Sequence, residues 1–221
     1  MIRADLHVHS YFSTDSEEPL ENAVLAAINA GLKTMCMTEH MDMDFPGGGF
    51  MVDTEAYKSE LFSLREKYAD RIELLFGIEL GLMDYLAQRL YEYTAGQKFD
   101  FIIGSSHLVD GMDPYEPEYF DKYGDKNGIL RYFESILANI SVFDDFDVYG
   151  HPDYAVRYCK AKSYKPVDYR ELGGEIITVG SDGHKGEHIA YDFRKAEEIL
   201  RSAGFEYYTV FRQRKAEFVK I

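Results

Sequence analysis

The sequence predicts an α/β fold with a largely parallel sheet, either closed as a barrel or open and doubly wound. Apolar runs of strand length alternate with stretches of helical spacing along the chain. Most histidines stand at the ends of these runs, where parallel strands open on one common face. No linker, repeat or composition shift divides the 221 residues, so we expect a single domain over 1–221.

The strand-like runs recur seven times, and helical stretches separate most of them. In order, the runs are Ile2 to Val8, Thr34 to Thr38, Ile72 to Leu80, Phe99 to Ser105, Phe146 to Gly150, Glu175 to Gly180 and Tyr207 to Phe211. Apolar residues at helical spacing predict helices over Leu20 to Ile28, Tyr57 to Tyr68, Ile129 to Phe143 and Phe193 to Leu200. Glu18-Pro19 marks the start of the first helix and Asn29-Ala30-Gly31 its end.

The composition excludes several classes of protein. With 24 Lys+Arg against 39 Asp+Glu the net charge is −15, which repels nucleic acid and anionic membranes unless bound cations or a local patch reverse the field. No run approaches the ~20 apolar residues of a membrane span, and the N-terminus lacks the apolar stretch of a signal peptide. Cys36 and Cys159 cannot form a disulfide framework. We therefore expect a cytoplasmic protein without nucleic-acid or membrane partners.

Histidines and carboxylates mark the ends of the runs. Six of the seven histidines follow a strand-like run: His7, His9, His40, His107, His151 and His184. Glu79 closes the third run, and Asp182 precedes a histidine by two positions. Strict alternation in Asp5-Leu6-His7-Val8-His9 places its three polar residues on one face of a strand. His188 lies on a later loop and is as readily a surface residue as a functional one.

This mixture of imidazoles and carboxylates is typical of zinc, iron or manganese sites, since calcium prefers cages of oxygen. One histidine at a strand end is usually a structural polar residue. Six of them together with an Asp-x-His pair indicate a shared site for more than one ion. Close divalent ions would reverse the negative field locally and polarise water toward hydroxide.

These motifs resemble those of a known family. Six segments, in order, are similar to the motifs of the PHP (polymerase and histidinol phosphatase) superfamily: Asp5-Leu6-His7-Val8-His9-Ser10, Thr38-Glu39-His40, Gly77-Ile78-Glu79, Gly104-Ser105-Ser106-His107, Gly150-His151-Pro152 and Gly180-Ser181-Asp182-Gly183-His184. Within it, the chain is most similar to the histidinol-phosphate phosphatases, through Thr38 to Asp42, Gly77 to Gly81 and Ile103 to His107.

The resemblance implies a distorted (β/α)7 barrel with two or three divalent ions, Zn, Mn or Fe, at the carboxyl ends of the strands. The implied metal ligands are His7, His9, Asp15, His40, Glu79, His107, His151, Asp182 and His184. Glu79 is expected to bridge ions. Asp15 lies in a loop where an aspartate is also a good turn residue or helix cap. Asp5 is expected to orient a ligand histidine through its other ring nitrogen.

The implied activity is hydrolysis of the small phosphomonoester L-histidinol phosphate, in histidine biosynthesis, by attack of a metal-bridging hydroxide. Asp182 or His184 could handle the proton of the leaving oxygen. Arg157 is a candidate phosphate clamp because a guanidinium binds phosphate with two hydrogen bonds, although it is equally readable as a surface arginine. We expect Asp42, Phe50 and Asp110, on loops that also carry Asp44 and Asp113, to contact the ammonium and imidazole of the substrate.

The family pattern breaks between Tyr169 and Gly173, where related phosphatases carry a further helix, strand and helix. Either residues are missing from the sequence or the protein lacks one βα unit here. Unpaired strand edges would then favour a swapped or paired dimer, or a collapsed barrel. The implied metal ligands all remain. Two alternatives therefore stay open: a PHP phosphoesterase for other substrates, and a catalytically impaired metal-binding protein.

Overall fold

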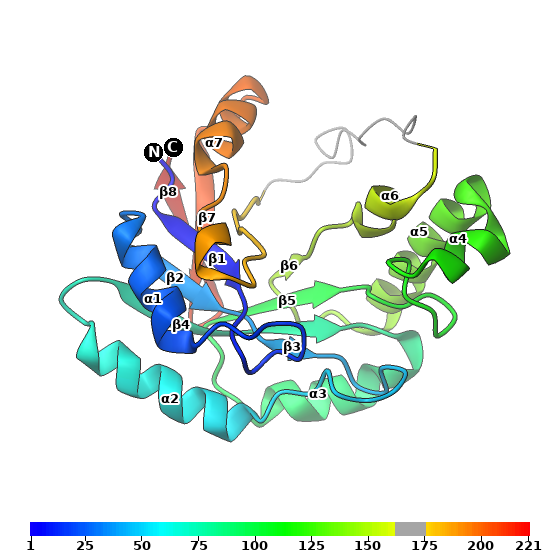
Figure 1. Cartoon of the computed structure of the whole chain (residues 1–221), viewed down its shortest axis with the longest axis horizontal. Helices are drawn as coiled ribbons and strands as arrows, with labels where there is room; N and C mark the ends of the chain where they lie inside the picture. The colour runs from blue at the N-terminus through cyan, green and yellow to red at the C-terminus, as the bar shows by residue number, and fades with distance from the viewer. Residues whose placement is uncertain (162–175) are drawn as a thin grey trace.

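A curled parallel sheet forms the centre of the molecule. The structure is a computed structural model, and it describes residues 1–161 and 176–221. The sheet runs in the order β1 (Ala4–Val8), β2 (Thr34–Met37), β4 (Glu73–Gly81), β5 (Phe101–Ser105) and β6 (Val148–Tyr149), with β3 (His40–Met41) paired to the distal part of β4. Every pairing within it is parallel. The predicted α/β class is confirmed as a half-barrel that spans from β1 to β6 (Figure 1).

All four helices predicted from the sequence are present. They are α1 (Leu20–Asn29), α2 (Thr54–Lys67), α5 (Asp125–Val142) and α7 (Phe193–Ser202). In α1, the residues Leu20, Ala23, Val24 and Ala27 are buried, at the spacing that gives a helix one apolar face. Asp53 caps α2 by accepting a hydrogen bond from the backbone N–H of Ala56. None of the described helices is long and apolar enough to cross a bilayer.

Three short α-helices had no clear sequence signal. They are α3 (Ala87–Ala95), α4 (Pro117–Tyr123) and α6 (Tyr154–Tyr158), and two turns of 3₁₀-helix, η1 (Asp84–Leu86) and η2 (Gly186–His188), accompany them. Helices α4, α5 and α6 lie together beyond the ends of β5 and β6 (Figure 1). Their packing forms a second, smaller apolar cluster around Tyr119, Phe120 and Tyr132, distinct from the main core that surrounds the sheet. The carboxyl ends of the strands therefore face a wall with a core of its own.

The predicted strand over Glu175 to Gly180 is not formed in its described part. Residues 176–180 run as irregular chain between β1 and β7 (Tyr207–Arg212). Their carbonyls accept isolated bonds, from Leu6 N to Val179 O at 3.0 Å and from Thr209 N to Ile177 O at 2.8 Å, instead of a regular ladder. The interval from Tyr169 to Gly173, where the family pattern breaks, lies outside the described residues.

The last predicted strand belongs to a separate antiparallel hairpin. β7 pairs with β8 (Lys215–Lys220), which was not predicted, and the two form their own sheet. Only Gln213 and Arg214 connect them, both with positive φ, 50° and 63°. Two residues can join antiparallel strands but cannot make the crossover that a parallel pair needs. The strand predicted over Tyr207 to Phe211 is therefore present, but it pairs in an antiparallel hairpin and lies outside the parallel sheet.

Candidate metal centre

The carboxyl ends of the strands bring the predicted ligands together around one carboxylate. Glu79 on β4 is fully buried and is the direct register partner of His40 on β3. Five histidine rings surround it: Oε2 lies 3.5 Å from His7 Nε2, 3.5 Å from His9 Nε2 and 3.2 Å from His40 Nδ1, while Oε1 lies 3.2 Å from His107 Nε2 and 2.9 Å from His151 Nε2. Because its two oxygens face different sets of nitrogens, Glu79 is placed as a carboxylate shared between neighbouring sites.

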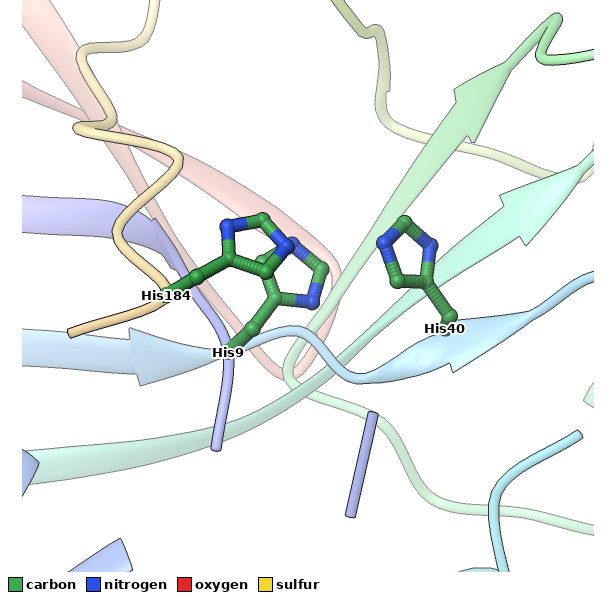
Figure 2. A group of neighbouring side chains, drawn as sticks. All are labelled: His9, His40 and His184. Atoms are coloured by element: carbon green, nitrogen blue, oxygen red, sulfur yellow. The ribbon is translucent and has the colours of Figure 1, made fainter. Parts of the chain in front are cut away.

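A second group of histidines adjoins the first. The rings of His9, His40 and His184 converge from the end of β1, from β3 and from the loop after residue 180 (Figure 2). His9 stacks on the other two, with ring centroids 4.3 Å apart in each case. Asp15 Oδ2 lies 3.2 Å from His184 Nε2 and 3.6 Å from His40 Nε2. Asp15 is thus within the site, on its open side.

The ligand candidates that lie late in the chain stand on unusual backbone. Asp182 Oδ1 lies 3.0 Å from His7 Nε2. Asp182 has φ 52° and His151 has φ 21°, both in the region that non-glycine residues rarely adopt. Such strain persists only where the surrounding structure imposes it, and it concentrates at functional sites.

Outer partners orient several of the rings. Asp42 is buried, with Oδ1 2.6 Å from His107 Nδ1 and Oδ2 3.3 Å from His40 Nδ1. Thr38 Oγ1 lies 3.4 Å from His7 Nδ1. A histidine that donates from one ring nitrogen presents the other to a metal. Asp42, expected as a substrate contact, is therefore also positioned to fix the direction of the His107 ring.

Asp5 acts differently from the expectation that it orients a histidine ring. Its carboxylate accepts hydrogen bonds from Ser181 N at 2.9 Å, Ser181 Oγ at 2.7 Å and Ala190 N at 3.0 Å, with His7 N at 3.4 Å. All but one of these donors are backbone amides, and none is an imidazole. The buried Asp5 thus ties the loop that carries Asp182 to β1, so the predicted mode of action is wrong.

Burial disfavours the charged form of the titratable groups in the site, and the charges of neighbouring side chains decide which of these groups stay charged. Burial raises the pKa of Glu79, but the charges of the surrounding imidazoles, His7 first, outweigh it and hold that pKa well below its usual range. Burial is the main cause that lowers the pKa of His9 to about 3. For His107, burial is outweighed by Asp42 and Glu79, which raise the pKa to about 10. A negative core encircled by imidazoles is the arrangement that a cation cluster requires.

The donor set fits divalent metal ions. Buried polar atoms without a hydrogen-bond partner in the described chain include His40 Nδ1, Asp42 Oδ2, Glu79 Oε2, His151 Nδ1 and His184 Nε2. Unpaired buried polar atoms are costly, so their concentration here calls for a ligand. Five overlapping groups of three side chains each bring their ligand atoms within 4.8 Å of one another: His9, His40, His184; His7, His151, Asp182; His7, His9, Glu79; His40, Asp42, His107; and Glu79, His107, His151. More than one ion can be held with nitrogen and oxygen ligands that suit zinc, manganese or iron.

A cavity of about 500 Å³ opens onto this cluster. Aromatic and acidic side chains form its outer part: Phe45, Phe50, Asp113, Tyr115, Glu116, Tyr154 and Tyr158. Phe50 and Asp42 also line this cavity, and their contact with substrate stays a prediction. Asp110 instead lines a neighbouring cavity, where it pairs with Arg131 at 2.5 Å. Arg157 lies on α6, pairs with Asp153 at 3.3 Å, and is not among the described residues that line the cavity. Its phosphate-clamp role stays a prediction.

Sequence reasoning missed a buried network beside the site. Glu39, Ser10 and Ser13 are all enclosed, and Ser13 contacts His9. The aromatic wall of Tyr154 and Tyr158 was missed too, because α6 has only five residues and no apolar periodicity to reveal it. The sequence did mark Glu39, since it stands in the motif Thr38-Glu39-His40. The motif alone does not determine whether the side chain of Glu39 faces the metal site or the interior behind it.

Comparisons with known proteins agree with this geometry. A family model described as the PHP domain matches residues 5–202. A histidinol-phosphatase of Lactococcus lactis subsp. lactis is 26% identical, covering 98% of this chain and 97% of the relative, and a probable histidinol-phosphatase of Clostridium acetobutylicum is 26% identical over 91% and 94%. The crystal structure of the Lactococcus lactis histidinol phosphate phosphatase, complexed with zinc, L-histidinol and phosphate, has a TM-score of 0.90 at 25% identity, covering 97% of this chain and 98% of that one.

The relative also contains residues that this chain lacks. The alignment with the Lactococcus lactis enzyme extends over 261 positions, 40 more than the 221 residues here, so at least 40 of its positions have no counterpart. This agrees with an internal segment being absent. The family nevertheless follows from a match that spans most of the sequence, together with a site built from the same motifs. The chain therefore belongs to the PHP domain family, as a metal-dependent phosphoesterase that resembles the histidinol-phosphatases.

Proposed function

We propose that the protein hydrolyses L-histidinol phosphate to L-histidinol and phosphate, as a step of histidine biosynthesis, with two or three divalent ions bound. The observation that carries the proposal is the placement of Glu79 among five imidazoles at the base of a cavity. The Lactococcus lactis relative, whose crystal structure holds zinc, L-histidinol and phosphate, supports the choice of substrate. Bound divalent ions would neutralise phosphate charge and make a water acidic enough to attack phosphorus.

The chain's own residues have separable tasks in this proposal. The metal ligands would be His7, His9, Asp15, His40, Glu79, His107, His151, Asp182 and His184. Asp182 and His184 line the cavity and keep part of their side chains exposed, so one of them is proposed to pass a proton to the leaving oxygen of histidinol. A ligand role limits either residue here, because an atom that holds an ion cannot also carry that proton. Asp42 would hold His107, which makes a direct contact between Asp42 and the substrate secondary to that task.

The outer wall of the cavity suits the rest of the substrate. The ring of Phe50 packs against that of Phe45 and is available to an imidazole. Asp113 accepts hydrogen bonds from Tyr154 Oη and Tyr115 N, both at 2.8 Å, and brings negative charge to the side where an ammonium would lie. Asp110 lies apart from this wall and lines a neighbouring cavity, where it pairs with Arg131.

Release of inorganic phosphate tests the proposal. Protein loaded with Zn²⁺ or Mn²⁺ should hydrolyse L-histidinol phosphate much faster than p-nitrophenyl phosphate. Equal rates on both substrates would reject the specific assignment and leave a PHP phosphoesterase of broader range. Bound metal with background turnover on every phosphoester would favour a catalytically impaired protein, the second candidate. The specific observation behind it is that at least 40 positions of the Lactococcus lactis relative have no counterpart here.

A further inference from the structure

A buried hydrogen-bond chain leads away from the metal centre through His9. Glu39 follows Thr38 in the chain, and its side chain is fully enclosed. It accepts from Ser10 N at 3.1 Å and 3.0 Å, from Ser10 Oγ at 2.6 Å and from Ser13 Oγ at 2.6 Å. Ser13 Oγ in turn lies 3.0 Å from His9 Nδ1 and 3.1 Å from the backbone N of His40. The carboxylate therefore reaches two ligand candidates through one hydroxyl.

The donor and acceptor capacity of the Ser13 hydroxyl determines the tautomer of His9. A serine hydroxyl has one proton to donate and two lone pairs that accept. The Ser13 hydroxyl donates to Glu39 Oε2 at 2.6 Å, so its one proton is used in that bond. Both lone pairs of Ser13 then receive donors, the backbone N–H of His40 and the Nδ1 position of His9. His9 must consequently carry its proton on Nδ1.

This tautomer leaves the other nitrogen of His9 bare where the cluster needs a ligand. His9 Nε2 lies 3.4 Å from His7 Nε2, 3.5 Å from Glu79 Oε2 and 3.4 Å from Asp182 Oδ1. With the proton on Nδ1, the Nε2 lone pair of His9 is available to a cation. The Glu39 carboxylate, which contacts no ligand candidate directly, therefore determines that the Nε2 lone pair of His9 faces the site.

The same chain also holds the loop that carries Asp15. Ser13 N donates to Ser10 O at 2.8 Å and Ser16 N donates to Ser13 O at 3.1 Å. With Ser10 and Ser13 both fastened to Glu39, the intervening turn is pinned against the strand. Asp15, between Ser13 and Ser16, is thereby held 3.2 Å from His184.

We propose that Glu39 is a positioning residue that acts through Ser13 to hold His9 in the Nδ1–H tautomer. This buried Glu–Ser–His chain would keep Nε2 of His9 unprotonated and available to bind a metal ion. The inference rests on the metal-binding part of the proposed function and not on the identity of the substrate. Metal binding alone tests it, so failure of the protein to hydrolyse L-histidinol phosphate would reject the substrate assignment and leave this inference standing.

The sharpest variant is Glu39→Gln, which keeps the size of the side chain. An amide turned toward Ser13 donates to its oxygen, which redirects the Ser13 proton to His9 Nδ1 and puts the His9 proton on Nε2. Cobalt(II) titration, followed by the visible absorption of the bound ion, should show affinity lower by about 10- to 100-fold in Glu39→Gln and Ser13→Ala, with a changed absorption band.

A matched control lies at the opposite end of the sheet, where β2 and β4 begin. Thr34 Oγ1 donates to Glu73 Oε2 at 2.8 Å, so Glu73→Gln also removes a carboxylate that accepts from a hydroxyl. Cobalt affinity and absorption in Glu73→Gln should match the unmodified protein. Unchanged cobalt binding in a folded Glu39→Gln protein, or equal loss in Glu73→Gln, would overturn the proposal.

A measurement on the unmodified protein covers the case in which the variants do not fold. Long-range proton–nitrogen NMR of ¹⁵N-histidine-labelled, zinc-loaded protein distinguishes the two tautomers of each ring. The His9 signals should show a protonated Nδ1 and a metal-shifted Nε2. A protonated Nε2 on His9 would contradict the proposal whatever the variants do.

Discussion

The early and the late parts of the chain contribute to the metal centre in different ways. His7, His40, Glu79 and His107 stand on or directly after hydrogen-bonded strands and are less than a tenth exposed. Asp182 and His184 stand on a loop with 38% and 23% of their side chains exposed. Strand pairing thus fixes the early ligands, while the late ones depend on a few loop contacts.

This difference has an energetic meaning. A ligand on a paired strand is placed by the same bonds that hold the fold, so it is in position before any ion arrives. A ligand on a strained loop spends conformational energy, about 1–3 kcal/mol for a residue in a sparsely populated backbone region. We therefore expect the early ligands to determine whether ions bind at all, and the late ligands to adjust how they react.

The largest effect is expected for Glu79→Gln. The amide keeps the volume but removes the charge on which five imidazoles converge. Outer partners of ligands alone are worth up to about 100-fold in metal affinity, so a shared ligand should cost more than that. Elemental analysis after gel filtration should find the loss of at least one ion, and phosphate release should fall to background. Retention of every ion would contradict the central position given to Glu79.

Proton release on metal binding sharpens the same comparison. Before metal binds, burial opposes the charge of His107 and His40, but the neighbouring carboxylates outweigh it and raise both pKa values, that of His107 to about 10. Metal needs neutral rings, so zinc must displace these protons, and affinity should rise about tenfold per pH unit for each proton displaced. His9 contributes none, because its pKa is lowered to about 3.

Calorimetry in two buffers of different ionisation enthalpy measures that release. Zinc binding at pH 7 should show a heat that depends on the buffer. The raised pKa values also give the sign of the pH dependence of folding in the metal-free protein. These histidines stabilise the fold fully below about pH 6.5, and that contribution is lost as pH rises through the folded pKa. A heat independent of buffer would mean that the rings are already neutral.

A smaller effect is expected for Asp182→Asn. Asparagine tolerates the φ of 52°, so the loop keeps its shape while one carboxylate ligand is lost. Metal affinity should fall by about tenfold to 100-fold at one site only. Asp192→Asn is the matched control, since Asp192 also has positive φ, 55°, and lies at the start of α7. A loss of all ions in Asp182→Asn would show that the late ligands are as essential as the early ones.

Sequence reasoning succeeded where a period or a strand end fixed the geometry. Alternation predicted that His7 and His9 share a face, and their Nε2 atoms lie 3.4 Å apart. The convergence of residues as distant as His40 and His107 followed from the common direction of parallel strands, and their rings lie 5.2 Å apart. Both predictions depend on backbone regularities that any sequence of this pattern must obey.

Loops escaped the same reasoning. Asp110 follows the proposed metal ligand His107 by only three positions, yet its side chain turns to Arg131 and a different cavity, because no period fixes the direction of a loop residue. The hairpin turn of Gln213 and Arg214 lacks the Asn or Gly that usually marks positive φ. Its position depends instead on partners distant in sequence, such as Asp147, which Arg214 contacts at 2.6 Å.

The smallest effect is expected where the two parts of the site are joined, at Asp5. Its carboxylate holds Ser181 and Ala190 against β1, but burial is the largest influence on its pKa and raises it, so the charge is already costly in the fold. The folded state therefore binds a proton more tightly than the unfolded chain, and the contribution of Asp5 to stability declines as pH rises above the unfolded pKa. Asp5→Asn loses hydrogen bonds but also avoids the cost of the buried charge. The free energy of unfolding at pH 7, measured in urea, should therefore fall by only about 1 kcal/mol. Loss of about 3 kcal/mol or more would show instead that the ionised carboxylate is what keeps the late loop, and with it Asp182, in place.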